Sequence, residues 1–279
     1  MGCRSSGGNA MSDANSGKNS AANSTTPVTN EIKAGGFSDN LPADFNPPAD
    51  DVGRKLLKEY GAVFVARGGA VAPKVVVFKD AAAVSSFQAT ASASRDTVRG
   101  ILLELQEPAM KALKEAIADA EKDGATITPR GADAAKRSYD DTVKLWASRV
   151  DPGLQHWSSA GKISAADAAR IRSLAPFDQV SEILKLEQQG AYFSRDFQKS
   201  IIYSVAPPGA SQHLSLLALD VTEHDDPRVR SILANHGWFQ TVVSDLPHFT
   251  FLGVEQSALQ KLGLKQVIDA GRTFWVPNI

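Results

Sequence analysis

The stretch Ser211-Gln-His-Leu-Ser-Leu-Leu-Ala-Leu-Asp220 holds the most informative pattern in this chain of 279 residues. Its histidine, His213, comes seven positions before Asp220, and a second histidine follows in Asp245-Leu-Pro-His248. Two imidazoles and a carboxylate form a donor set that suits Zn²⁺, with one coordination position left open for water. Asp245 lies three residues before His248 and is free to move protons. These residues together predict a metal-dependent hydrolase.

The spacing of His213 and Asp220 proves little by itself, because the chain contains 5 histidines and 31 acidic residues. The sequence around the two motifs makes the pattern more specific. Ala206-Pro-Pro-Gly-Ala precedes the first motif, an apolar stretch leads to Asp220, and His248-Phe-Thr-Phe-Leu-Gly253 follows the second acid.

With these flanking residues, the two motifs resemble the zinc peptidases of the D-alanyl-D-alanine carboxypeptidase type. Their superfamily also includes lysostaphin-like endopeptidases and the hedgehog signalling domain. The first family motif is Ser-x-His-x-x-Gly-x-Ala-x-Asp, and this chain matches it, with Leu216 in place of glycine, at Ser211, His213, Ala218 and Asp220. The second is Glu-x-x-His-Phe, then an aromatic residue and a glycine, matched here, with Asp in place of Glu, by Asp245, His248, Phe249, Phe251 and Gly253.

The resemblance implies a role for each matched polar residue. His213, Asp220 and His248 would be the ligands of a Zn²⁺ cofactor. Asp245 would act as general base and then as general acid. Ser211 would hydrogen-bond a ligand or the substrate, or alternatively stabilise a turn. Because aspartate is one methylene shorter than glutamate, a domain that binds zinc and muropeptide without cleaving it is the open alternative.

The chain must fold back between the first two proposed ligands. Seven fully extended residues would separate His213 from Asp220 by roughly 23 Å. The family's glycine eases this bend, whereas a left-handed Leu216 would cost about 1–2 kcal/mol. We therefore expect the turn in this chain to differ locally.

A substrate-binding arginine is expected upstream of the first motif. In the family, a helix, a glycine and a strand lead to a Tyr-Arg-Ser sequence whose arginine holds the terminal carboxylate of the substrate. Here Pro129-Arg130-Gly131 occupies that place. Arg130 is the candidate clamp, since a guanidinium offers the forked donor pair that a carboxylate accepts. Because the tyrosine and the serine are both missing, a solvated surface arginine is the alternative.

The predicted fold is α+β, with an antiparallel sheet that holds the zinc site and helices on its other side. Residues 1–48, rich in Gly, Ser, Asn, Ala and Pro, are predicted to be a flexible, disordered tether. Residues 49–104 would form an N-terminal α/β subregion. Residues 105–279 would form the peptidase domain, with a helical insertion at about 134–195.

Hydrophobic periodicity and capping residues predict the individual elements. Helices are expected at 52–60, 107–122, 134–146, 164–174, 180–189 and 258–263. Strands are expected at 62–66, 74–78, 125–128, 214–221, 238–243, 249–254 and 273–276.

Composition narrows the class of protein. The net charge of −1 gives no reason to expect nucleic acid or an anionic membrane surface as a partner. No apolar run approaches the roughly eighteen residues needed to span a bilayer. Cys3 is the single cysteine, which excludes an internal disulfide and a cysteine-rich zinc site.

Cys3 follows Gly2, and three readings of this end remain open. A lipidated cysteine followed by a Ser/Asn-rich tether is typical of bacterial lipoproteins, although the apolar signal segment would then have to precede the given sequence. Met1-Gly2-Cys3-Arg4-Ser5-Ser6 also fits N-myristoylation. The third reading is an inert end.

The sequence therefore predicts a zinc-dependent D,D-carboxypeptidase that trims a terminal D-amino acid from peptidoglycan stem peptides. It would act outside the cytoplasmic membrane, in the periplasm or cell envelope, with possible lipid attachment through Cys3. The alternatives are an endopeptidase that cuts cross-links and a non-catalytic cell-wall-binding lipoprotein. His224 and His236 are interpreted as loop histidines, with His236 the next candidate for the base. The sequence gives no indication of oligomeric state.

Overall fold

The structure, a computed structural model, describes Met1 and residues 31–279. Cys3, with its lipidation alternatives, and residues 2–30 of the predicted tether lie outside the described residues. Residues 31–48 pack against the folded part of the chain. Phe37 is buried, and the Asn40 side chain donates to the backbone carbonyl of Lys261 at 3.1 Å. The folded part therefore begins before residue 48.

The α+β prediction is confirmed. Among the described residues, the ladders between strands are antiparallel and form two hairpins and one three-stranded sheet in the order β3-β5-β4. The strands are β1 (Ala93–Val98), β2 (Ile101–Gln106), β3 (Ala218–Asp220), β4 (Trp238–Phe239), β5 (His248–Phe251), β6 (Leu264–Asp269) and β7 (Arg272–Pro277).

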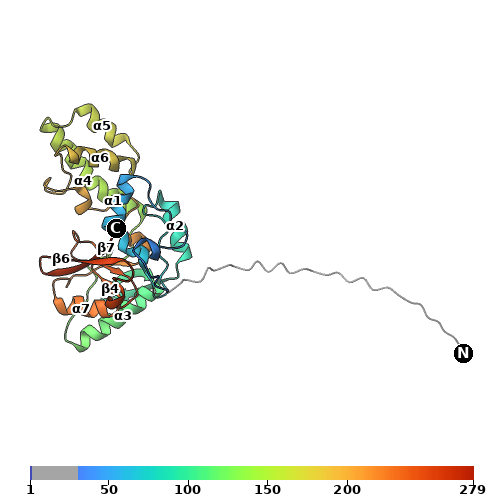
Figure 1. Ribbon diagram of the computed structural model, residues 1–279. Helices are drawn as coiled ribbons and strands as arrows, with labels where there is room; N and C mark the ends of the chain where they lie inside the picture. The colour runs from blue at the N-terminus through green and yellow to red at the C-terminus, as the bar shows by residue number, and fades with distance from the viewer. Residues whose placement is uncertain (2–30) are drawn as a thin grey trace.

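The helices fall into two groups in space. Figure 1 shows α4, α5 and α6 together in the upper part of the molecule, apart from α3, α7 and the strands β4, β6 and β7. The helices are α1 (Asp51–Tyr60), α2 (Ala81–Thr90), α3 (Glu107–Lys122), α4 (Tyr139–Ser159), α5 (Ala165–Ser173), α6 (Asp178–Gln188) and α7 (Pro227–Asn235). The short 3-10 turns are η1 (Ser38–Asn40), η2 (Gly61–Val65), η3 (Ile201–Tyr203), η4 (Gln212–Ser215) and η5 (Gln256–Ala258).

Four expected helices are confirmed as α1, α3, α5 and α6, with ends that differ by at most two residues. The helix expected at 134–146 instead begins at Tyr139. Ser138 and Asp141 form a reciprocal capping box there, which fixes the start of α4. The helix continues past Trp146 to Ser159, with Pro152 in its interior.

Several predicted strands are wrong. Residues 62–66 lie mainly in η2, and residues 74–78 form only an isolated bridge at Val75. Val63, Phe64 and Val65 are all buried, so no apolar–polar alternation distinguishes a strand from a buried turn. The segment expected at 125–128 forms no strand; Thr128 accepts from the backbone N–H of Thr222, and Pro129, just beyond it, forms an isolated bridge with Val221.

Other predicted elements are shorter than expected, and some were missed. The strand at 214–221 is reduced to β3 behind η4, and the strand at 238–243 to β4. The helix expected at 258–263 is wrong, because η5 ends at Ala258 and turns follow it. The β1–β2 hairpin, α2 and α7 had no predicted counterpart. Across the part of the chain that the structure describes, no helix is both long enough and apolar enough to cross a membrane.

Candidate metal centre

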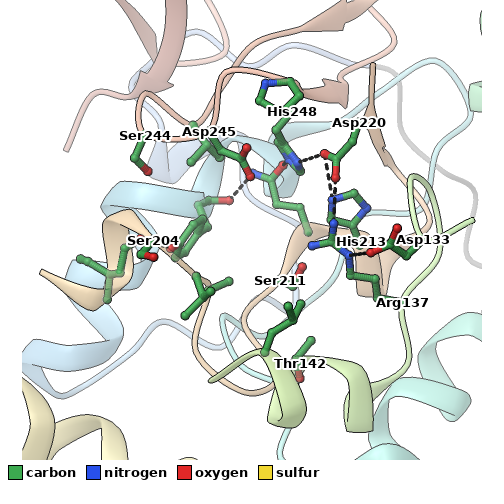
Figure 2. A pocket seen from close by; sticks show the side chains of 18 of the residues that line it. Asp133, Arg137, Thr142, Ser204, Ser211, His213, Asp220, Ser244, Asp245 and His248 are labelled. Carbon is green, nitrogen blue, oxygen red and sulfur yellow. Dashed lines mark hydrogen bonds and ion pairs between the residues drawn. The ribbon is translucent and has the colours of Figure 1, made fainter. Parts of the chain in front are cut away.

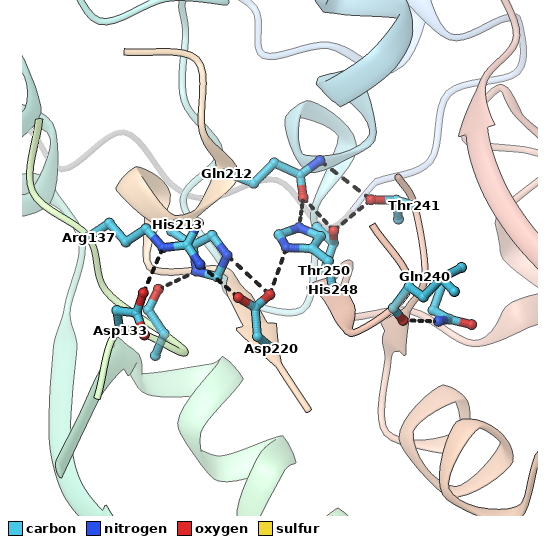
Figure 3. Close-up of polar contacts among 11 residues, drawn as sticks. Asp133, Arg137, Gln212, His213, Asp220, Gln240, Thr241, His248 and Thr250 are labelled. Atoms are coloured by element: carbon cyan, nitrogen blue, oxygen red, sulfur yellow. Dashed lines mark hydrogen bonds and ion pairs between the residues drawn. The ribbon is translucent and has the colours of Figure 1, made fainter. Parts of the chain in front are cut away.

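The sheet order brings the three proposed ligands together. His213 lies on η4, Asp220 is the last residue of β3, and His248 is the first residue of β5. Asp220 and His248 are direct partners in the antiparallel register. All three residues are buried. Figure 3 shows both imidazole rings directed at the Asp220 carboxylate.

The chain folds back between His213 and Asp220 through a left-handed residue. Leu216 has φ 59° and ψ 26°, so the expectation of a locally different turn is wrong. Its carbonyl accepts from the backbone N–H of Gln106 at 3.0 Å, and its side chain is 0% exposed. Packing and this hydrogen bond hold a conformation that strains a non-glycine residue by about 1–2 kcal/mol.

The proposed ligand atoms are mutually close. Nε2 of His213 lies 3.3 Å from Oδ1 of Asp220, and Nδ1 of His248 lies 3.2 Å from the same oxygen. All three atoms fall within 4.8 Å of one another. A cation between them would therefore have two nitrogens and an oxygen as neighbours.

The hydrogen bonds of Gln212 determine which nitrogen of His248 bears the proton. The Gln212 Nε2 donates to the backbone carbonyl of Tyr60 at 2.7 Å, so its Oε1 is an acceptor. That oxygen lies 2.9 Å from Nε2 of His248, which must therefore be the protonated nitrogen. Nδ1 of a neutral His248 then presents a lone pair to Asp220.

The same reasoning applies to His213. Its Nδ1 lies 2.8 Å from the backbone carbonyl of Ala135, which can only accept, so Nδ1 is protonated. Nε2 is buried and has no hydrogen-bond partner among the described residues. Burial, as the largest influence, lowers the pKa of His213, which favours its neutral form. A second lone pair thus faces the Asp220 carboxylate.

This arrangement fits a metal ion. Arg137 donates to Oδ2 of Asp220 at 2.7 Å, and this cation favours the ionised carboxylate. With the tautomers set by Ala135 and Gln212, two lone pairs face that carboxylate with no proton between them. Hydrogen bonds from the far side of each ring, as seen here, are typical of histidine ligands in metal sites. The buried group of His213, Asp220 and His248 can therefore bind a cation.

A cavity of about 340 Å³ opens beside this group. Its volume lies at the lower end of the roughly 300–1,000 Å³ range of small-molecule sites. All six residues singled out in the sequence line it: Arg130, Ser211, His213, Asp220, Asp245 and His248. Asp245 is exposed, and its carbonyl accepts from the backbone N–H of His248, which closes the turn leading into β5. Figure 2 shows Asp245 beside His248 at the cavity.

The other two histidines considered as alternatives lie elsewhere. His236 ends α7, and its Nε2 is 2.9 Å from a carboxylate oxygen of Asp119. His224 contacts Arg272 and Asp225. Neither histidine lines the cavity.

Sequence reasoning missed Arg137. Its Nη2 donates to Oδ2 of Asp220 at 2.7 Å, and its Nε is 3.8 Å from the Asp133 carboxylate. The sequence does contain a signal, because Lys136-Arg137-Ser138 retains the last two residues of the family's Tyr-Arg-Ser motif. The clamp was instead sought seven residues earlier, at Arg130. Arg149 on α4 also lines the cavity and was not anticipated.

Comparisons with known proteins give little help. No protein-family model matches the chain, and a search of curated proteins finds no match. One solved structure that it resembles is described as "Structure of the LdcB LD-carboxypeptidase reveals the molecular basis of peptidoglycan recognition", at 16% sequence identity and a TM-score of 0.32. The alignment covers 57% of this chain and 64% of that chain, so this chain spans less than two thirds of it. At this TM-score the likeness supports neither a fold nor an activity.

Proposed function

We propose that this protein is a zinc-dependent peptidase of the D-alanyl-D-alanine carboxypeptidase type, which removes a terminal D-amino acid from peptidoglycan stem peptides. The observation that supports it most is the pair of imidazole lone pairs facing one oxygen of an ionised Asp220. The residues that match the family's motifs all border the same cavity. The substrate class rests on the resemblance of those motifs.

His213, Asp220 and His248 would hold the ion. Zn²⁺ at such a site polarises an amide carbonyl and lowers the pKa of bound water. Asp245 takes the proton of the attacking water and then delivers it to the leaving amine. Its exposed carboxylate borders the cavity close to His248, where the turn from 245 to 248 fixes its backbone.

Two arginines have separate tasks in this proposal. Arg130 is the clamp for the terminal carboxylate, because it is exposed, lines the cavity, and donates its backbone N–H to the Asp220 carbonyl. Arg137 orients the Asp220 carboxylate through Oδ2 and so leaves Oδ1 directed at the two rings. An endopeptidase that cuts cross-links would use the same catalytic residues without the clamp.

A non-catalytic, cell-wall-binding protein is the second candidate, and the shorter side chain of Asp245 favours it. Proton transfer requires heavy atoms at about 2.6–3.2 Å, and aspartate reaches less far than the family's glutamate. Either function places the protein outside the cytoplasmic membrane, in the periplasm or cell envelope, with Cys3 as the proposed lipid attachment.

Zinc content and cleavage of purified stem peptides, followed by amine release, test the proposal. A chelator and the variant His213→Ala are each expected to remove both zinc and cleavage. Asp245→Asn should keep zinc and lose turnover by about 10²–10⁴-fold, the usual contribution of general acid–base catalysis. His236→Ala is the matched control, since its ring lies outside the cavity. Wild-type cleavage by His213→Ala would reject the metallopeptidase, and full turnover by Asp245→Asn would place the base elsewhere.

A further inference from the structure

Arg149 is a cationic side chain that the proposed reaction does not use. It lies on α4, is half-buried, and lines the same cavity as the metal ligands. Its Nε donates to Oγ of Ser204 at 3.0 Å, and its Nη1 donates to Oγ of Ser148 at 2.9 Å. Within residues 31–279 it forms no ion pair with a carboxylate, and its Nη2 has no hydrogen-bond partner.

The other two arginines of the cavity differ from it. Arg137 pairs with the carboxylates of Asp220 and Asp133, so its charge is compensated within the protein. Arg130 is exposed, so water solvates its charge. The charge of Arg149 is neither paired with a carboxylate nor fully solvated by water. Of the three arginines that line the cavity, it is therefore the one that an anion would stabilise most.

Electrostatics support this contrast. Burial, and after it the charge of Arg195, lowers the pKa of Arg149. An arginine nevertheless stays protonated in proteins. A partly desolvated cation next to a second cation is stabilised by a negative group that approaches through the cavity.

The position of Arg149 suggests which part of a ligand it meets. Figure 2 shows Ser204 on one side of the cavity, with His213 and Arg137 on the opposite side. Because Arg149 is hydrogen-bonded to Ser204, it lies on the Ser204 side. The Ser204 hydroxyl accepts from Arg149 and has no acceptor of its own among the described residues, so its proton is free to donate. Arg149 and Ser204 thus offer two donors at the end of the cavity away from the metal group.

We propose that Arg149 and Ser204 form a subsite for a second carboxylate of the substrate, on the acyl side of the scissile amide. This subsite rests on the proposed peptidase function and narrows its substrate class to peptides with an acidic residue two positions before the cleaved bond. A guanidinium and a hydroxyl bind a carboxylate by charge-assisted hydrogen bonds, whereas a carboxamide would place an N–H₂ donor against them.

Two peptides that differ by one group test this subsite: acetyl-Glu-D-Ala-D-Ala and acetyl-Gln-D-Ala-D-Ala. Both retain the terminal carboxylate, so Arg130 treats them alike. Binding is measured by calorimetry on the zinc-loaded Asp245→Asn protein, where the peptides should remain intact, and cleavage is measured on the protein with Asp245. We expect the glutamate peptide to bind about tenfold more tightly, the ratio that one charged hydrogen bond supplies.

Variants locate the effect. Arg149→Gln should lower the affinity for the glutamate peptide alone, so that the two peptides bind equally. Arg149→Lys should retain part of the preference for glutamate. Arg195→Gln is the matched control, because Arg195 is exposed, influences Arg149, and does not line the cavity. It should keep the full preference. Thermal unfolding of each variant verifies that it is folded.

The outcomes separate the subsite from the reaction. A preference that disappears in Arg149→Gln supports the subsite even if neither peptide is cleaved, which would reject only the hydrolase. If the protein that keeps Arg149 binds both peptides equally, the subsite is overturned, even if both peptides are cleaved. A preference that survives in Arg149→Gln overturns it as well.

Discussion

Two buried carboxylates, Asp220 at the end of β3 and Glu187 near the end of α6, have opposite surroundings. Glu187 accepts from the backbone N–H of Ile201 at 2.7 Å, from that of Phe193 at 3.2 Å, and from the hydroxyl of Ser200. Asp220 accepts from Arg137 through one oxygen, while its other oxygen faces two imidazole lone pairs.

Their pKa values move in opposite directions. Burial raises the pKa of Glu187 in spite of its three donors, whereas that of Asp220 is held low. Through its three hydrogen bonds, Glu187 holds Phe193, Ser200 and Ile201 against α6, which is a structural role. The comparison teaches that burial of a carboxylate does not by itself indicate a functional site. Hydrogen-bond donors surround Glu187, whereas one oxygen of Asp220 faces ring nitrogens without protons, and this difference separates a structural carboxylate from a candidate metal ligand.

The same isosteric change at the two positions is expected to have different consequences. Asp220→Asn removes the only anionic ligand that the proposed site offers to a cation. Zinc affinity should therefore fall by more than the roughly 10–100-fold that is typical of changes outside the ligand set. Glu187→Gln should leave zinc affinity unchanged. Competition with a chromogenic chelator measures both values. Equal zinc affinity in Asp220→Asn and the wild type would break the comparison.

At Glu187 the expected effect is on stability. Glu187→Ala leaves the Ser200 hydroxyl and two backbone N–H groups buried without an acceptor, each at about 1–3 kcal/mol. We expect the free energy of unfolding to fall by roughly 3 kcal/mol or more. Glu187→Gln keeps an oxygen for the two N–H groups and should change stability far less. Urea unfolding of the two variants at neutral pH measures the difference.

Glu187 also predicts the sign of a pH dependence. Its pKa in the folded state is raised above the ordinary value of 4.5, so the folded chain binds its proton more tightly than the unfolded chain does. The stability contribution is therefore complete below 4.5 and is lost as the pH rises through the raised pKa. Glu187→Gln does not titrate there, and its stability relative to wild type should increase with pH over that window. A relative stability that decreases over the window would contradict this assignment.

A smaller effect is expected at Gln212, which fixes the tautomer of His248. Gln212→Met removes the acceptor of the His248 Nε2–H, and zinc affinity should fall about 10–100-fold in the folded variant. Gln179→Met is the control, because Gln179 bonds Trp146 in the helical part and contacts no proposed ligand. Unchanged zinc affinity in a folded Gln212→Met protein would show that the tautomer is fixed by other groups.

Local sequence patterns predicted the parts of the molecule that depend on local chemistry. Helices with a clear cap, such as α5 behind Ser164, were placed within one or two residues. The buried segment at 62–66 was not, because its conformation is set by tertiary packing around every side chain. The resemblance of the two motifs to the zinc peptidases implied that His213, Asp220 and His248 would meet, and their donor atoms lie together.

Residues that act through contacts distant in sequence could not be predicted. Gln212 reaches the backbone of Tyr60, 152 positions earlier, and Arg149 borders the cavity only because α4 packs beside it. Nothing local in the sequence encodes either contact. Arg137 differs, since its Arg-Ser pair was visible and was passed over in favour of Arg130.

The smallest expected effect concerns backbone strain, which also differs between the turn after α6 and the turn before β3. The turn after α6 uses Gly190 at φ 84°, whereas the turn beside the candidate metal centre uses Leu216 at φ 59°. Leu216→Ala and Leu216→Gly should both be less stable than wild type, because a buried leucine side chain contributes about 2–5 kcal/mol. Glycine escapes the left-handed strain, so the glycine variant should be the more stable of the two by about 0.5–1 kcal/mol.

Leu219 provides the matched control for this order, because it is equally buried but lies in the extended strand β3. There alanine should be favoured over glycine by about 0.5–1 kcal/mol, since glycine loses more conformational freedom on folding. Urea unfolding of the four variants measures the two differences. If glycine is more stable than alanine at 216 but less stable at 219, the backbone at Leu216 is strained and glycine relieves that strain. The leucine side chain then stabilises the turn through packing. The same order at both positions would show that Leu216 is not strained.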